Sequence, residues 1–129
     1  MNKYTELSDF EINLAVAHIA LGKGSYDWCP DKKEVYFAGI DGGEFLHHGY
    51  FDPCNNPSDA MPIIIENNIS LHAPNLREGW MAEYTGSGDD VNDGLQADYF
   101  DAHNKNPLRS AMEVFLMMKD AENENNNDS

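Results

Sequence analysis

The chain has 129 residues, of which 41% are hydrophobic, 23 are acidic and 8 are basic, giving a formal net charge of −15. That length favours one domain with a core of its own. The negative charge argues against direct binding to nucleic acid or to an anionic membrane surface, because both depend on Lys and Arg. It is compatible with solubility alone, with a basic protein partner, or with imitation of a nucleic acid's charge.

The expected location is the cytoplasm. No run approaches the ~18 apolar residues of a membrane span, and the N-terminal stretch MNKYTELSDFEIN has no secretory apolar region. We therefore expect Cys29 and Cys54 to be reduced thiols rather than a disulfide.

The first predicted element is a helix that ends near Gly22. Ser8 and Glu11 have the spacing of a capping box, and FEINLAVAHIALG follows. Residues 12–21 contain only two polar side chains. A helix that is apolar round most of its circumference must be covered on most of it. We expect it to be sandwiched inside the domain or to lie at a subunit contact.

The middle of the chain is predicted to supply the sheet. Alternation and β-forming residues predict strands at 34–38, 68–73 and 79–85, and a turn with a short irregular strand at 41–50. The second and third strands are expected to form an antiparallel hairpin through a turn at 74–79. Residues 22–33 and the acidic, glycine-rich segment 86–94 are predicted loops.

Residues 51–57, FDPCNNP, form what we call the CNNP loop, ahead of a predicted short helix AMPIIIENN. With Asp59 as the N-cap, Pro62 falls at the third helical position, where no backbone N–H is needed. Asn67 or Asn68 is expected to close the helix in the left-handed conformation. The whole stretch is then a rigid loop that delivers a short apolar helix onto the sheet.

The last predicted helix is NPLRSAMEVFLMMKD, with Asn106 as N-cap and Pro107 at its first position. The expected fold is α+β, an αβα sandwich-like arrangement in which a small antiparallel sheet of about three to four strands packs with three helices. Residues 1–119 are predicted to form a single domain. Residues 120–129, acidic and without a large apolar side chain, are predicted to be a disordered tail.

No catalytic or metal signature is present, so we expect no enzyme activity, no catalytic residues, no metal and no cofactor. A pair such as His47 and His48 with Asp52 or Cys54 could hold a metal ion. Adjacent strand residues point to opposite faces, however, so the two histidines cannot easily reach one ion. A nucleophile at Cys54 would need a base that nothing in the sequence supplies.

A small-molecule site is the second possibility. The candidate ligand-binding residues are aromatic, amide and guanidinium groups that stack on and hydrogen-bond a nucleotide-like molecule: Asn55, Asn56, Trp80, Tyr84 and Arg109. Arg109 stands in the first turn of its helix, where a cation opposes the helix dipole. The structural alternative is an ion pair, with Asp59 and Glu66 as candidate partners.

Four segments resemble the NinX family of tailed phages and prophages of enteric bacteria: LSDFEIN, CNNPSDAMPIIIENNISL, the strand around Trp80, and NPLRSAMEVFLMMK. Their order matches over most of residues 6–119. Met61 stands where many relatives carry Trp, and Ser110 where Ala is frequent; segments 23–49 and 85–104 match weakly. The resemblance implies an αβα architecture, a phage origin and action in the bacterial cytoplasm, and it implies no activity.

The resulting hypothesis is a small acidic phage accessory protein that is not catalytic and binds a host or phage protein, with a basic partner as one option. A disordered acidic tail and the charge of −15 motivate it. The alternative is a non-catalytic binder of a nucleotide-like molecule near the CNNP loop. A homo-oligomer is compatible with both, because the first helix is so apolar.

Overall fold

The computed structural model describes residues 3–22, 24–38, 47–74, 79–85 and 99–127. Its elements, in chain order, are α1 (Asp9–Ala20), β1 (Tyr26–Cys29), β2 (Glu34–Ala38), β3 (His47–Tyr50), α2 (Pro57–Glu66), β4 (Ser70–His72), β5 (Trp80–Thr85), β6 (Tyr99–Asn104) and α3 (Pro107–Asn127). None of the helices in these segments has the length and apolarity needed to cross a bilayer.

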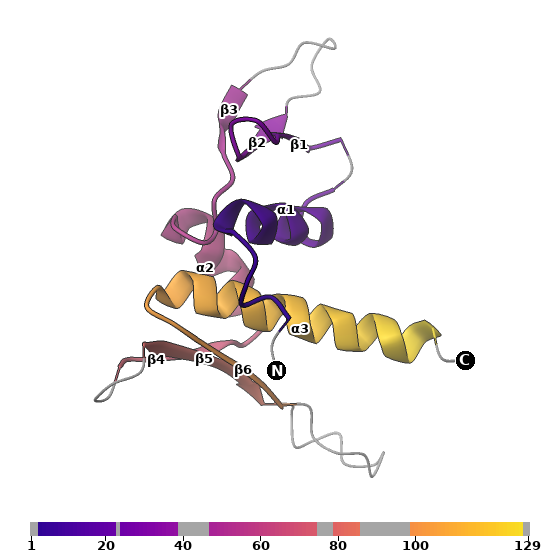
Figure 1. Ribbon diagram of the computed structural model, residues 1–129. Helices are drawn as coiled ribbons and strands as arrows, with labels where there is room; N and C mark the ends of the chain where they lie inside the picture. Colours follow the sequence, from indigo (N-terminus) through magenta and orange to yellow (C-terminus); the bar gives the residue numbers. More distant parts are fainter. Residues whose placement is uncertain (1–2, 23, 39–46, 75–78, 86–98, 128–129) are drawn as a thin grey trace.

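The strands form two antiparallel sheets, β1-β2-β3 and β4-β5-β6. Figure 1 shows α3 lying across the β4-β5-β6 sheet, with α1 and α2 on its other side and the β1-β2-β3 sheet beyond α1. The α+β class and the three helices are confirmed among the described residues. The arrangement differs from the expected one, because two outer sheets enclose the helices where one sheet of three to four strands was expected.

The capping box at the start of α1 is present. The Ser8 hydroxyl accepts from the backbone N–H of Glu11 at 3.1 Å, and the Ser8 N–H donates to the Glu11 carboxylate at 2.8 Å. The helix packs against α3 on one side and β2 on the other (Figure 1). The buried Ile12, Val16 and Ala17 agree with the first of the two expectations, a helix sandwiched within the fold, whereas Ile19 and Ala20 near its end are exposed.

The N-cap of α2 is Asn56, so the prediction of Asp59 at that position is wrong. The Asn56 side chain accepts from the backbone N–H of Ser58 at 3.0 Å, and Pro57 occupies the first helical position. An Asn followed by Pro supplies both the cap and a preset backbone angle, so the helix starts three residues earlier than expected. Pro62 consequently lies inside the helix rather than in its first turn.

The other end of α2 closes as predicted. Asn68 has a φ of 56°, in the left-handed region that Asn tolerates better than most residues. The backbone N–H of Asn67 still donates to Ile63 at 3.1 Å. The chain then turns directly into β4, so it passes from α2 on one side of α3 to the β4-β5-β6 sheet on the other.

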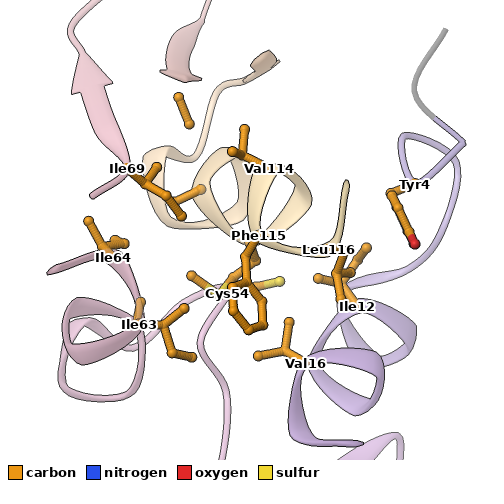
Figure 2. Close-up of a cluster of buried hydrophobic side chains, with 14 of the residues drawn as sticks. Tyr4, Ile12, Val16, Cys54, Ile63, Ile64, Ile69, Val114, Phe115 and Leu116 are labelled. Atoms are coloured by element: carbon orange, nitrogen blue, oxygen red, sulfur yellow. The ribbon is translucent and has the colours of Figure 1, made fainter. Parts of the chain in front are cut away.

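One buried cluster joins the helices to both sheets. Figure 2 shows Phe115 of α3 pointing into the space between α1 and α2, with Val16 and Ile63 on either side of its ring. Val114 lies on the opposite face of α3, on the same side as Ile69, which immediately precedes β4. Because α3 is covered on both faces, it is the central element of the core.

The helix α3 continues to Asn127 and so includes most of the segment predicted as a disordered tail. Asp120 accepts a hydrogen bond from the Tyr4 hydroxyl and forms an ion pair with Lys3 at 3.2 Å. Lys119 pairs with Glu122 at 3.5 Å, one turn along. Glu, Asn and Ala can extend a helix whose preceding turns are already held by packing, even without apolar side chains of their own.

The predicted hairpin of β4 and β5 is confirmed, with Leu71 opposite Ala82. The strand β6, which the sequence did not predict, pairs with the other edge of β5. Ala82 and Ala102 are buried on the face toward α3, so alternate residues of these strands point outward. The strand β1 was likewise assigned to a loop and pairs with β2.

Gly79 stands where β5 meets the end of β6, and replacing it by Ala is expected to destabilise the fold by about 1–3 kcal/mol. An added Cβ would lie 2.4 Å from the carbonyl oxygen of Asn104, a backbone atom that cannot move aside alone. Urea unfolding followed by circular dichroism measures the change. Gly22→Ala is the matched control, because its Cβ would meet only the Ser25 hydroxyl at 3.7 Å. Equal stability of the two variants would contradict the clash.

Candidate functional site

The CNNP loop is held against α1 by Asn13, which is 7% exposed. Its amide nitrogen donates to the Asp52 carboxylate at 2.8 Å, and its amide oxygen accepts from the backbone N–H of Cys54 at 3.1 Å. Both halves of one side chain therefore bind the loop. Asn13, a polar residue in a mostly apolar stretch of α1, therefore has a structural role: it holds the CNNP loop.

Asn106 holds the same loop from the other side. Its amide oxygen caps α3 by accepting from the backbone N–H groups of Leu108 at 2.9 Å and Arg109 at 3.3 Å. Its amide nitrogen donates to the carbonyl of Cys54 at 2.6 Å and to the side chain of Asn55 at 3.1 Å. The predicted N-cap is confirmed, and the same residue also anchors the loop.

Replacing Asn106 by Ala is expected to destabilise the fold by about 2–4 kcal/mol, since it removes a helix cap and leaves the buried carbonyl of Cys54 without this donor. Asn106→Ser separates the two losses: Ser caps a helix about as well as Asn, but it cannot reach Cys54. We expect Ser to recover about 1 kcal/mol in urea unfolding. A Ser variant as unstable as the Ala variant would mean that the cap contributes nothing.

Arg109 is 5% exposed, and all three of its guanidinium nitrogens donate to groups of the protein. Its Nε donates to Glu113 at 2.6 Å and its Nη1 to Asp9 at 2.7 Å. Its Nη2 donates to the backbone carbonyls of Tyr4 at 2.9 Å and Leu7 at 2.8 Å. Arg109 thus joins α3 to the N-terminal segment and the first turn of α1.

The ion-pair alternative for Arg109 is therefore the one observed, but the expected partners Asp59 and Glu66 are wrong. Asp59 accepts from the backbone N–H of Asp52 at 2.9 Å instead. Burial works against the charged guanidinium, but the hydrogen bonds to Glu113 and Asp9 outweigh it and raise the pKa of Arg109. Its charge is compensated inside the fold.

The other candidate ligand-binding residues are spread over different elements. Asn55 donates to the carboxylates of Asp52 and Asp9, and Asn56 caps α2. Trp80 and Tyr84 lie on the face of β5 toward α3, and Tyr84 stacks with Phe100 at a centroid distance of 6.5 Å. The described residues do not bring these side chains together around one cavity.

A cleft of about 540 Å³ does lie beside the CNNP loop. Three carboxylates line it, those of Asp9, Glu34 and Asp52, together with Asn55 and a single cation, Lys33. A site with this excess of negative charge repels phosphate. Its electrostatics do not suit a nucleotide.

A larger groove of about 600 Å³ lies between the end of α1, α2 and α3, and we call it the apolar groove. Its apolar lining comes from β2, the CNNP loop and all three helices: Ile19, Leu21, Phe37, Phe51, Ile63 and Phe115. Asp59, Glu66 and Lys119 supply its charged groups. Ile19 is 43% exposed.

Two further apolar side chains are exposed on α2, Met61 at 38% and Ile65 at 67%. They lie on the helix stripe next to Pro62, which lines the apolar groove. The sequence contained a signal for this surface in the run of three isoleucines. Consecutive helical residues are 100° apart, so three in a row cannot all face one core. Ile63 and Ile64 are buried and Ile65 is not.

Among the described residues, the other titratable side chains form small surface groups. Burial raises the pKa of the Cys54 thiol far above its ordinary value, so this thiol is not a ready nucleophile. On the outer face of the β4-β5-β6 sheet, His72 pairs with Glu83 at 2.8 Å and His103 with Asp101 at 3.3 Å. Within the described segments, no three His, Cys, Asp or Glu side chains are arranged to hold a metal ion.

A family model described as "Bacteriophage P22, NinX" matches residues 3–119. The chain belongs to the NinX family. The resemblance seen in the sequence is thereby confirmed, and it extends through segments 23–49 and 85–104, which resembled the family only weakly. Comparisons with curated proteins and with solved structures gave no match.

The NinX match includes the whole polar network around Arg109 and the residues that line the apolar groove. It ends at residue 119, before the last turns of α3. Membership in the NinX family identifies a phage accessory protein. It assigns no reaction and no partner, so the function has to be argued from the surfaces of this chain.

Proposed function

We propose that this NinX-family chain is a non-catalytic accessory protein that acts in the host cytoplasm by binding a phage or host protein through the apolar groove. The observations that carry the proposal are the apolar lining of the groove and the exposed apolar side chains on the helices that form it. Ile19 on α1 lines the groove, and Met61 and Ile65 lie on α2; all three are more than a third exposed. Exposed apolar surface with polar residues around it is typical of a protein-binding site.

The charges around the groove support a basic partner. Two carboxylates, Asp59 and Glu66, and one cation, Lys119, line the groove, and Lys119 is itself paired with Glu122 at 3.5 Å. The chain as a whole carries a net charge of −15. A partner with Lys or Arg around an apolar anchor would gain both a faster encounter and a correct orientation.

The two other classes of function have less support. Catalysis by Cys54 would require ionising a fully buried thiol, which its raised pKa opposes. A nucleotide-like ligand at the CNNP loop would have Lys33 of the neighbouring cleft as its cation, because the Arg109 guanidinium is bonded to Glu113, Asp9 and backbone carbonyls. The three carboxylates of the neighbouring cleft oppose such an anion further.

The test is an affinity purification from infected cells with tagged wild-type chain and two variants, washed at low and high salt. Ile65→Arg places a charge in the exposed apolar surface without touching the core, and we expect it to lower recovery of the bound protein at least tenfold. Ser70→Arg adds the same charge at an exposed position on β4 and should leave recovery unchanged. Mass spectrometry identifies and quantifies the bound proteins.

Equal recovery with all three chains would place the binding surface elsewhere and overturn the proposal. If Ile65→Arg weakens recovery equally at both salt concentrations, the result would support the apolar groove as the binding surface and would contradict a basic partner. A heat-released small molecule without any bound protein would instead favour the ligand-binding alternative.

A further inference from the structure

One side of α2 lines the apolar groove, and we call it the α2 wall: Ser58, Asp59, Pro62, Ile63, Glu66 and Asn67. These positions recur at the spacing of one helix face, so they form a single stripe. Two carboxylates stand on it, those of Asp59 and Glu66. They are two helical turns apart, about 10 Å along the axis, so one small group cannot bind both.

Pro62, inside α2, leaves a backbone acceptor in this wall. In a regular helix the carbonyl of Ser58 accepts from the N–H four residues later, and proline has no N–H. Ser58 and Pro62 both line the groove, and both are exposed. A donor that lies in the groove at the level of Pro62 can therefore bind a carbonyl that lacks its usual helical partner.

Glu66 supplies a second acceptor at the same level. Side chains on a helix lean toward its N-terminus, so the Glu66 carboxylate is directed toward the turn that contains Pro62. Glu66 is exposed, and no described Lys, Arg or His forms an ion pair with it. Lys119, a cation of the groove lining, pairs with Glu122 at 3.5 Å instead and lies 5.6 Å from the centre of the Phe115 ring. Within the described part of the chain, the charge of Glu66 is thus available to a cation from a partner.

Asp59 adds negative charge at the other end of the wall. It accepts from the backbone N–H of Asp52 at 2.9 Å. Burial raises the pKa of Asp59, because the hydrogen bonds to its carboxylate do not offset the loss of water. A cation bound in the groove one turn away would stabilise the charged form of this carboxylate.

Building on the proposed function, we propose that the partner places an arginine side chain in the apolar groove, with its guanidinium bound to the Glu66 carboxylate and the Ser58 carbonyl. A guanidinium carries five N–H donors and no acceptor, which suits two acceptors that lie at one level of the wall. Its aliphatic stem packs on apolar surface, which Ile63 and Phe115 supply in the groove. A lysine would bring a compact, strongly hydrated charge, which an apolar groove suits less well.

The probe is a displayed library of random short peptides, selected on the wild-type chain. The enriched sequences should carry arginine beside apolar residues. The best of them is synthesised in two forms, as selected and with norleucine in place of arginine, which keeps the apolar stem and removes the guanidinium. Fluorescence anisotropy gives both dissociation constants, and their ratio is the preference for arginine. On the wild-type chain we expect a preference of about tenfold or more.

Three variants test where the guanidinium binds. Glu66→Gln keeps the shape of the side chain, removes its charge and should lower the preference about threefold or more. Pro62→Ala returns an N–H to the carbonyl of Ser58 and should lower the preference as well, while it raises the urea midpoint of unfolding. Loss of the proline ring alone would weaken both peptides equally and leave the preference unchanged. Glu6→Gln is the matched control, because it removes the same charge at an exposed position outside the groove lining and should keep the wild-type preference.

A library from which no peptide is enriched, enriched peptides without arginine, or a preference near one on the wild-type chain would overturn the proposal. An equal loss of preference in Glu66→Gln and Glu6→Gln would overturn it too, because arginine would then respond only to the net charge of the chain. A preference that Pro62→Ala leaves unchanged would contradict the bond to the Ser58 carbonyl. None of these results decides the proposed function, which fails only if Ile65→Arg leaves recovery of a bound protein unchanged.

Discussion

Replacing Arg109 by Met is expected to destabilise the fold by about 3–5 kcal/mol, the cost of removing one partner from a buried ion pair. Glu113 is 1% exposed and receives the Arg109 Nε at 2.6 Å, so its carboxylate would stay buried without that cation. The backbone carbonyls of Tyr4 and Leu7 would lose a donor in the same change. A loss of this size is a large part of the stability of an ordinary domain.

Urea unfolding followed by circular dichroism measures this loss, with a double variant as the comparison. Arg109→Met together with Glu113→Leu removes both charges, and replacing a buried ion pair by apolar groups of similar size is often nearly neutral. We therefore expect the double variant to be more stable than Arg109→Met alone. The result that contradicts the network is a double variant that is less stable than the single one, because the two losses would then simply add.

Arg109 also shows how far a sequence can lead toward a site. Its position in a first helical turn, among many carboxylates, correctly favoured an internal ion pair over a ligand. Glu113, one turn further along the same helix, was within reach of a spacing argument. Asp9 was not, because it precedes Arg109 by 100 residues and only the packing of α1 on α3 brings them together. Local rules therefore named the right kind of interaction and the wrong partners.

The strands show a similar division. The strands β2, β4 and β5 were predicted from alternation and β-forming residues, and the two that were missed, β1 and β6, each contain an Asp between aromatic or apolar residues. In β6 the sequence YFDAHN has only Phe100 and Ala102 as apolar side chains toward α3, and Ala102 is too small to give a hydrophobic signal. Its strand conformation depends on pairing with β5, a tertiary effect that a short stretch of sequence does not reveal. Missing these two strands also hid the second sheet.

The last comparison makes the same substitution at two isoleucines on helices. Ile12 is fully buried between α1 and α3, where Figure 2 shows it beside Leu116, whereas Ile65 is 67% exposed on α2. Ile12→Ala is expected to destabilise the fold by about 2–5 kcal/mol, because it removes apolar contacts and leaves a cavity. Ile65→Ala should change stability by less than about 0.5 kcal/mol, as surface substitutions usually do.

The difference in stability between these two variants, measured by urea unfolding, tests whether Ile65 is a surface residue, as the proposed function requires. An isoleucine that contributes little to the fold and yet stays exposed is surface that a partner can use. If Ile65→Ala were as destabilising as Ile12→Ala, Ile65 would belong to the core and could not offer its side chain to a partner. If instead Ile65→Ala keeps the stability and weakens recovery of a bound protein, the exposed side chain serves binding rather than folding. Ile65, the third isoleucine of the run, would then serve binding from the exposed position that helix geometry gives it.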